Sequence, residues 1–241
     1  MIEQLTPRIL ENKDWATLLF VVTFAVVAMT KSAYETRFSE FSKLIFSDKY
    51  AKIYRDNNHL KSTFTIGLFF VQIISFAFFI QLTMHIFSED PKTGTYSILK
   101  TDWILFIQIA TFLLYFILAK YLIEKIVATS FNIDDFADLF NLQKVTYRTY
   151  IGVLILPINA VLFYYDNIPK IIPLAIIGVS LCLSLYSYFI SIKTYQNAII
   201  GKLFYFILYL CALEIAPYYF LYYWITKGLS LIHISEPTRP Y

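Results

Sequence analysis

The residue best suited to chemistry is an acid in the middle of the last apolar run. Glu214 is the twelfth of the 23 residues in the run 203–225, and Pro217 and Tyr218 follow it on or near the same helical face. An acid at the centre of a bilayer is costly, so it is a functional candidate by default. Because Pro217 has no N–H, a carbonyl of the preceding turn is open to water or a cation. This pattern predicts a proton or cation site at Glu214, or alternatively a protonated acid that hydrogen bonds a neighbouring helix.

Uncharged polar residues interrupt two other apolar runs. Asn159 lies next to Pro157, where the helical hydrogen-bond ladder is loosened, and Gln72 and Ser75 lie in the middle of an earlier run. Such residues more often join helices than bind a ligand. Together with Glu214, they would alternatively line a narrow polar cavity between helices.

Catalytic and metal-binding patterns are weak in this chain. His85 and Glu89 have a spacing that would place two ligands on one helical face, with Asp90 beside them, but no third ligand follows nearby. The chain contains no nucleophile elbow, HExxH, Walker A or CxxC motif. We therefore expect no metal site, no cofactor and no enzymatic activity. A lipid-modifying enzyme that uses His85, Glu89 and Asp90 is the least favoured alternative.

The composition explains why these few polar residues stand out. Of 241 residues, 58% are apolar or aromatic and 15% are charged, whereas soluble domains have about 45–50% and about 25%. So little charge excludes a water-soluble domain and favours an integral membrane protein. The net charge of +3 comes without a dominant basic patch, which argues against nucleic-acid binding.

The elements that must position the polar residues are apolar runs of helical length. About 20 residues are needed to cross a bilayer core, and lipid offers no partner to an unpaired backbone group. The sequence therefore predicts an all-α bundle of six transmembrane helices forming a single domain over residues 1–228. The predicted spans are residues 15–30, 63–87, 103–123, 150–165, 171–192 and 203–225.

The distribution of basic residues predicts the orientation of the bundle. Alternate connections, counted with the adjoining helix ends, carry 13 Lys and Arg residues on one side of the membrane and 6 on the other. The basic side is expected to be cytoplasmic, so both termini are expected to be periplasmic. Lys120, Glu124 and Lys125 are then expected to reach the cytoplasmic headgroups, with Lys120 and Glu124 as an i,i+4 pair.

Two of the connections on the basic side have an amphipathic pattern. In residues 31–61 the apolar positions include Phe38, Phe41 and Ile45, and in residues 124–149 they include Phe136 and Phe140. Helical spacing with one wet face predicts a helix that lies on the membrane surface. A surface that docks a partner protein is the alternative interpretation of both segments.

The last residues have a different character from the rest of the chain. Residues 229–239 read LSLIHISEPTR, which looks like the translation of a sequencing adaptor. We therefore interpret residues 229–241 as a non-native tail and exclude them from reasoning about the fold.

Three stretches carry a resemblance to a known family. These are NKDWATLLF at residues 12–20, the basic amphipathic segment after the first span, and ALEIAPYYFLYYWI at residues 212–225. Over residues 12–225 the chain resembles a family of Bacteroidota inner-membrane proteins catalogued as domain of unknown function 4271. The resemblance implies a multi-pass protein in the inner membrane of a Gram-negative envelope, and it implies no reaction, cofactor or catalytic residue.

The small number of polar residues within the predicted spans and the amphipathic connections favour a non-enzymatic role. We expect a scaffold or accessory subunit for envelope assembly, in contact with the lipid bilayer and with a membrane-protein partner or a second copy of the chain. The alternative is a small-solute or proton-coupled transporter centred on Glu214.

Overall fold

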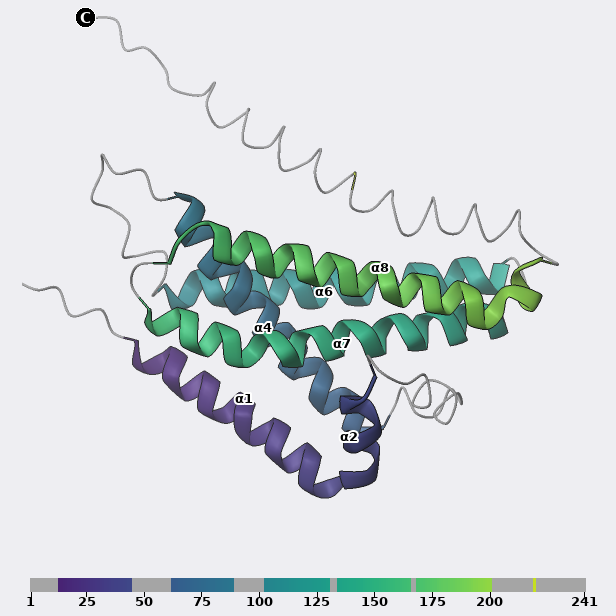
Figure 1. Cartoon of the computed structure of the whole chain (residues 1–241), viewed down its shortest axis with the longest axis horizontal. Coiled ribbons are helices and arrows are strands. Elements are labelled where there is room, and N and C mark those ends of the chain that lie inside the picture. The colour runs from purple at the N-terminus through teal and green to yellow at the C-terminus, as the bar shows by residue number, and fades with distance from the viewer. Residues whose placement is uncertain are drawn as a thin grey trace, which may run out of the picture.

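The described part of the chain is helical. The computed structural model describes residues 13–44, 62–88, 102–130, 134–165, 168–200 and Tyr219. These residues form the helices α1 (Asp14–Ala33), α2 (Glu35–Ser42), α4 (Thr63–Ser88), α6 (Trp103–Ser130), α7 (Asp134–Tyr164) and α8 (Ile171–Ile200), as Figure 1 shows. The all-α fold class is confirmed for this part of the chain.

Five of these helices are long and apolar enough to cross a membrane. They are α1, α4, α6 and, within the two longest helices, the segments Phe140–Tyr164 of α7 and Ile171–Phe189 of α8. They correspond to the first five predicted spans, and five helices of this length and composition are compatible with a membrane protein. The sixth predicted span, residues 203–225, lies outside the described residues.

Helices α4 and α7 form the centre of the bundle. They pack against each other, while α1 and α6 pack against α4 and α8 packs against α7 (Figure 1). In the apolar 18-residue stretch of α7 50% of the residues are buried, compared with 11% in that of α8. Between Ile171 and Phe189, α8 therefore presents most of its side chains outward, as expected of a helix in lipid.

Four of the 23 phenylalanines belong to a buried aromatic cluster shared by α1, α4, α6 and α7. Phe78 of α4 stacks on Phe20 of α1, with ring centroids 4.3 Å apart, and lies 4.5 Å from the ring of Phe106 in α6. Trp15 and Phe163 close the cluster from α1 and α7. One aromatic cluster thus joins four helices, and such ring pairs add stability beyond their buried area.

Helix α2 corrects the prediction of a surface helix in the described part of that segment, residues 31–44. Phe41 is 3% exposed, and its ring packs 5.9 Å from Phe64 of α4 and 5.5 Å from Tyr150 of α7. Arg37 lies over the Phe64 ring, and its guanidinium donates to Ser62 Oγ at 2.8 Å. The apolar face of this short helix is therefore covered by the first turn of α4 and by the apolar segment of α7, not by lipid. Phe41 is buried within the chain, which differs from the partner or lipid surface expected of it.

The connection 124–149 is not a separate surface helix either. Helix α6 continues to Ser130 and α7 begins at Asp134, so the segment extends two spanning helices beyond the predicted ends at 123 and 150. Two ion pairs cross the hairpin beyond those predicted ends, since Lys144 Nζ lies 2.8 Å from Glu124 Oε1 and Lys125 Nζ lies 2.7 Å from Asp138 Oδ2. Phe140 is 1% exposed, so it too is a core residue where a surface residue was expected.

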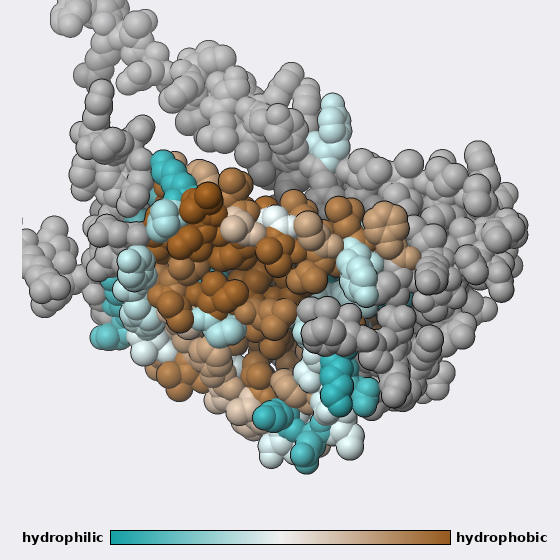
Figure 2. Space-filling view, viewed as in Figure 1, coloured by the Kyte–Doolittle hydropathy of each residue, from teal (hydrophilic) through white to brown (hydrophobic). Residues whose placement is uncertain are grey.

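The outer surface of the bundle is rich in apolar side chains. The face drawn in Figure 2 is mainly hydrophobic across its middle, and its hydrophilic residues lie mostly toward the margins. Large apolar side chains on α6 and α8 are more than half exposed, including Tyr115, Leu122, Ile126, Leu181 and Phe189. In a membrane this surface is solvated by lipid tails.

Candidate functional site

Several of the predicted site residues lie beyond the described part of the chain. Glu214, Pro217, Tyr218 and Ile45 are outside the described residues, and Phe136 is described as part of α7 without its side chain. The proton or cation site at Glu214 stays a prediction. Phe38 is half-buried at the edge of the cluster that holds Phe41.

The structure brings together Gln72, Ser75 and Asn159 in the interface between α4 and α7. The Asn159 side chain amide donates to the Ser75 carbonyl at 2.7 Å, and the Thr149 hydroxyl donates to Gln72 Oε1 at 2.8 Å. All four residues are buried. Both hydrogen bonds cross from one helix to the other, whereas Gln72 Nε2 and Asn159 Oδ1 are buried without a hydrogen-bond partner in the described structure. These residues therefore form a polar joint that fixes α4 against α7.

A glycine that sequence reasoning missed lies at the tightest point of this joint. A Cβ atom added to Gly152 of α7 would lie 2.9 Å from Gln72 Cγ and 3.0 Å from Gln72 Cα. Contacts that short are repulsive, so only glycine allows the α7 backbone to approach α4 this closely. A glycine three residues after Thr149, on the same helical face, is the signal that would have identified it.

A second polar cluster joins α6 to α7. Glu124 is 2% exposed, and its Oε1 lies 2.8 Å from Lys144 Nζ and 3.8 Å from Lys120 Nζ. The i,i+4 spacing of Lys120 and Glu124 was recognised in the sequence, but both side chains are buried where contact with headgroups was expected. Lys144 was not foreseen, because it lies 20 residues further along the chain on the opposing helix. Ionised groups are buried only with such partners.

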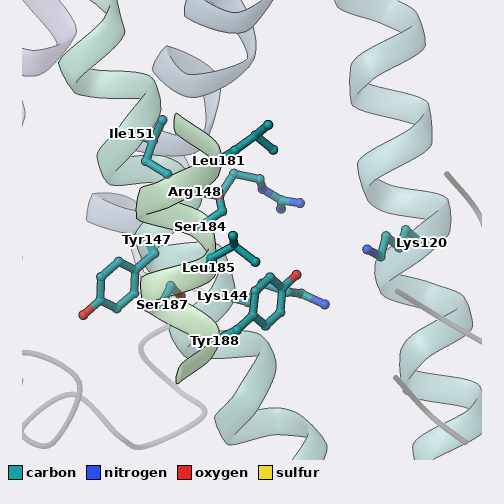
Figure 3. Close-up of a pocket in the computed structure, with 10 residues that line it drawn as sticks. All are labelled: Lys120, Lys144, Tyr147, Arg148, Ile151, Leu181, Ser184, Leu185, Ser187 and Tyr188. Carbon is teal, nitrogen blue, oxygen red and sulfur yellow. The ribbon is translucent and has the colours of Figure 1, made fainter. Parts of the chain in front are cut away.

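A cavity of about 360 Å³ adjoins this cluster, and Figure 3 shows the residues that line it. Its lining combines three kinds of side chain. The basic ones are Lys120, Lys144 and Arg148, those with a hydroxyl are Tyr147, Ser184, Ser187 and Tyr188, and the apolar ones are Ile151, Leu181 and Leu185. In Figure 3 Lys144 and Arg148 extend from α7 toward the side on which Lys120 lies, and Lys120 points back toward them.

The described lining of the cavity carries a net positive charge. The described lining residues carry three basic side chains and no carboxylate, and Glu124 contributes one negative charge behind Lys120 and Lys144. Ammonium and guanidinium groups donate strong hydrogen bonds to carboxylate and phosphate oxygens. The chemistry that this arrangement can perform is therefore the binding of an anion.

The residues suggested for metal binding are not gathered into a site within the described ranges. His85 lies in α4, whereas Glu89 and Asp90 are outside the described residues. Among the residues that the structure describes, no three His, Cys, Asp or Glu side chains come close enough together to hold a metal ion.

The fold and these two polar clusters define a class of protein, namely a multi-helix membrane protein whose central helices are joined by buried polar contacts beside a basic cavity. Within that class, the family described as domain of unknown function DUF4271 matches residues 16–225, and the chain belongs to this family. The family resemblance noted in the sequence is thereby confirmed. No curated protein and no solved structure matches the chain.

Proposed function

We propose that this protein is a non-enzymatic scaffold or accessory subunit in a bacterial inner membrane. The observation that supports the proposal is the use made of the buried polar residues. Gln72, Asn159 and Glu124 each bind a residue of a second helix, at distances of 2.7–2.8 Å. Such contacts hold the bundle in one arrangement, which is what a protein that presents a fixed surface to a partner requires.

The proposal includes six spans, with the α6–α7 hairpin on the cytoplasmic side. Described basic residues gather at that end of the bundle. Lys31, Arg37 and Lys43 lie in or after α1 and α2, and Lys120, Lys125, Lys144 and Arg148 lie on the hairpin, whereas Lys13 and Lys170 lie at the opposite end. This bias follows the positive-inside rule. With 203–225 as the sixth span, the segments before α1 and after residue 225 face the periplasm.

The partner surface proposed for this scaffold is the outer face of α6 or α8. Leu122 and Ile126 on α6, and Leu181 and Phe189 on α8, are more than half exposed. Membrane helices associate by close packing of such faces rather than by a hydrophobic driving force. The partner is a membrane protein or a second copy of the chain.

The test is co-purification of the tagged full chain from its own membranes in a mild detergent. We expect one membrane protein at a constant molar ratio to the chain. We compare L122A/I126A on α6 with L181A/F189A on α8, since the two variants remove similar apolar area from different faces. One of them should lose the partner and the other should keep it. A chain that runs alone at every detergent concentration, with no protein at constant ratio, contradicts the proposal.

A transporter is the second candidate, because the cavity beside α8 gives a solute a place to bind. Its test uses a variant without Cys182 and Cys211, into which Ser184→Cys or Val179→Cys is introduced. Ser184 lines the cavity, whereas Val179 lies outside it on the exposed face of α8. Alternating access requires Ser184→Cys to react with an impermeant thiol reagent from both sides of the membrane. Reaction from one side only, together with full cellular activity of Glu214→Gln, excludes a transporter centred on Glu214.

A further inference from the structure

We propose that the cavity between α6, α7 and α8 is a binding site for the phosphate group of an anionic membrane lipid. Lys120 comes from α6, and Lys144 and Arg148 come from α7 one helical turn apart. A phosphate group has oxygens enough to accept hydrogen bonds from all three side chains. The Ser184 and Tyr188 hydroxyls of α8 line the same cavity and add neutral polar groups.

Glu124 prepares the site by fixing two of its basic side chains. Its Oε1 holds Lys144 Nζ at 2.8 Å and Lys120 Nζ at 3.8 Å, and the carboxylate itself is buried. Lysine side chains lose much conformational freedom when they bind a ligand in one geometry. Two lysines that are already held in place lose less of it, so the binding free energy is more favourable.

The cavity lies within side-chain reach of the headgroup level of one leaflet. Lys144 and Arg148 are the fifth and ninth residues of the apolar segment Phe140–Tyr164, which places their backbones about 6 Å and about 12 Å from the start of that segment, measured along the helix axis. Long basic side chains at that depth reach toward the polar boundary of the membrane. Ser184 and Ser187 lie at the matching end of the apolar segment Ile171–Phe189.

The apolar side of the cavity favours a lipid over a small soluble anion. Leu181 and Leu185 of α8 line the cavity and are 60% and 57% exposed, so they also belong to the outward surface of the bundle. A ligand at the basic side chains therefore has an apolar path to the surrounding bilayer. An acyl chain fits along these leucines, whereas inorganic phosphate makes no use of them.

The test uses the purified full chain in a mild detergent. Phosphatidylglycerol, phosphatidylcholine or inorganic phosphate is added, and bound lipid is counted by native mass spectrometry together with the thermal unfolding midpoint. We expect phosphatidylglycerol to stay bound and to raise the midpoint, and the other two to do neither. Arg148→Gln should weaken phosphatidylglycerol binding about fivefold. The matched control is Lys31→Gln, which removes an exposed basic residue of α1 at the same end of the bundle.

A second variant tests the cavity without changing any charge. The Ser184 hydroxyl bonds the Ser180 carbonyl within α8, so Ser184→Phe fills the cavity and leaves the contacts of the basic residues in place. We expect this variant to lose bound phosphatidylglycerol and to keep its midpoint in phosphatidylcholine. Wild-type affinity in Ser184→Phe, or equal losses in Arg148→Gln and Lys31→Gln, overturns the site. An equal shift with inorganic phosphate overturns the lipid assignment. Both results are independent of whether the chain acts as a scaffold.

Discussion

At the scale of single residues, position 152 is the one at which the packing of α7 on α4 leaves no room for a Cβ atom. The missing Cβ of Gly152 lets the α7 backbone touch Gln72, beside the hydrogen bond from Thr149 to Gln72. Gly152→Ala should push α4 and α7 apart, weaken that hydrogen bond and lower the free energy of unfolding by about 1–3 kcal/mol. Equilibrium unfolding in mixed detergent micelles measures the change.

The chain supplies a matched control for this substitution in α8. A Cβ at Gly178 meets nothing within 4 Å, so Gly178→Ala should be neutral, or should stabilise by up to about 1 kcal/mol through helix propensity. If the two variants shift the unfolding curve equally and in the same direction, the close approach at Gly152 does not limit the packing of α4 on α7.

Glu124 is the second residue whose loss has a defined consequence. Its carboxylate is buried beside Lys144 and Lys120, so Glu124→Gln removes a negative charge from two basic groups that are themselves largely buried. We expect a loss of about 3–5 kcal/mol in the free energy of unfolding. Glu124→Gln combined with Lys144→Gln should lose less than the sum of the two single changes, which a double-mutant cycle measures.

The Lys125–Asp138 pair provides the comparison for Glu124. Lys125 is 41% exposed, and its ammonium contacts the carboxylate at 2.7 Å. Solvent screens such a pair, so Lys125→Gln should cost about 0–1 kcal/mol. A larger loss from Lys125→Gln than from Glu124→Gln would show that burial is not what makes the Glu124 contact matter.

At the scale of elements, α2 depends on one aromatic side chain. Phe41 fills the space between Phe64 of α4 and Tyr150 of α7. Phe41→Ala should leave a cavity and lower the free energy of unfolding by about 3–5 kcal/mol. Phe38→Ala, at the half-buried edge of the same cluster, should cost clearly less. A helix that lies on lipid would instead show equal and small effects for both phenylalanines.

The contrast between α2 and the spans explains which parts of the fold the sequence predicts. Hydropathy identifies α1, α4 and the apolar segments of α6, α7 and α8, because a span needs about 20 apolar residues whatever it packs against. It places the ends of α6 and α7 at residues 123 and 150, because charges begin there. The helices continue because those charges find partners across the hairpin, and such pairing depends on tertiary structure.

The same reasoning applies to the candidate site. Spacing within one helix predicts the Lys120–Glu124 pair, and an amide in an apolar run predicts a helix joint at Gln72 or Asn159. Lys144, Arg148 and Ser184 reach one cavity from two helices, and no pattern within a single helix reports that meeting. Amphipathic spacing also cannot say whether Phe41 faces lipid or protein, since both surfaces are apolar.

At the scale of the whole molecule, the distribution of basic residues and the number of spans together predict which segments lie on each side of the membrane. The α6–α7 hairpin and the end of α8 are proposed to lie on the cytoplasmic side, and a sixth span at 203–225 returns the chain to the periplasm. Alkaline phosphatase, which is active only in the periplasm, should be inactive when fused after residue 200 and active when fused after residue 228. Green fluorescent protein becomes fluorescent in the cytoplasm but not after export by the same route. Its fusions at the two positions should therefore give the opposite pattern.

Residues on opposite ends of the described bundle supply the internal control. In a variant without Cys182 and Cys211, Lys170→Cys in the turn before α8 should react with an impermeant thiol reagent added to intact cells with a permeable outer membrane. Lys43→Cys, after α2, should react only once the inner membrane is opened. If these two cysteines behave as expected while both reporter fusions lie on the cytoplasmic side, the five described spans are correctly oriented and 203–225 does not cross. Reversed labelling of the two cysteines would instead place the basic cavity in the outer leaflet, where a headgroup would reach it from the periplasmic side.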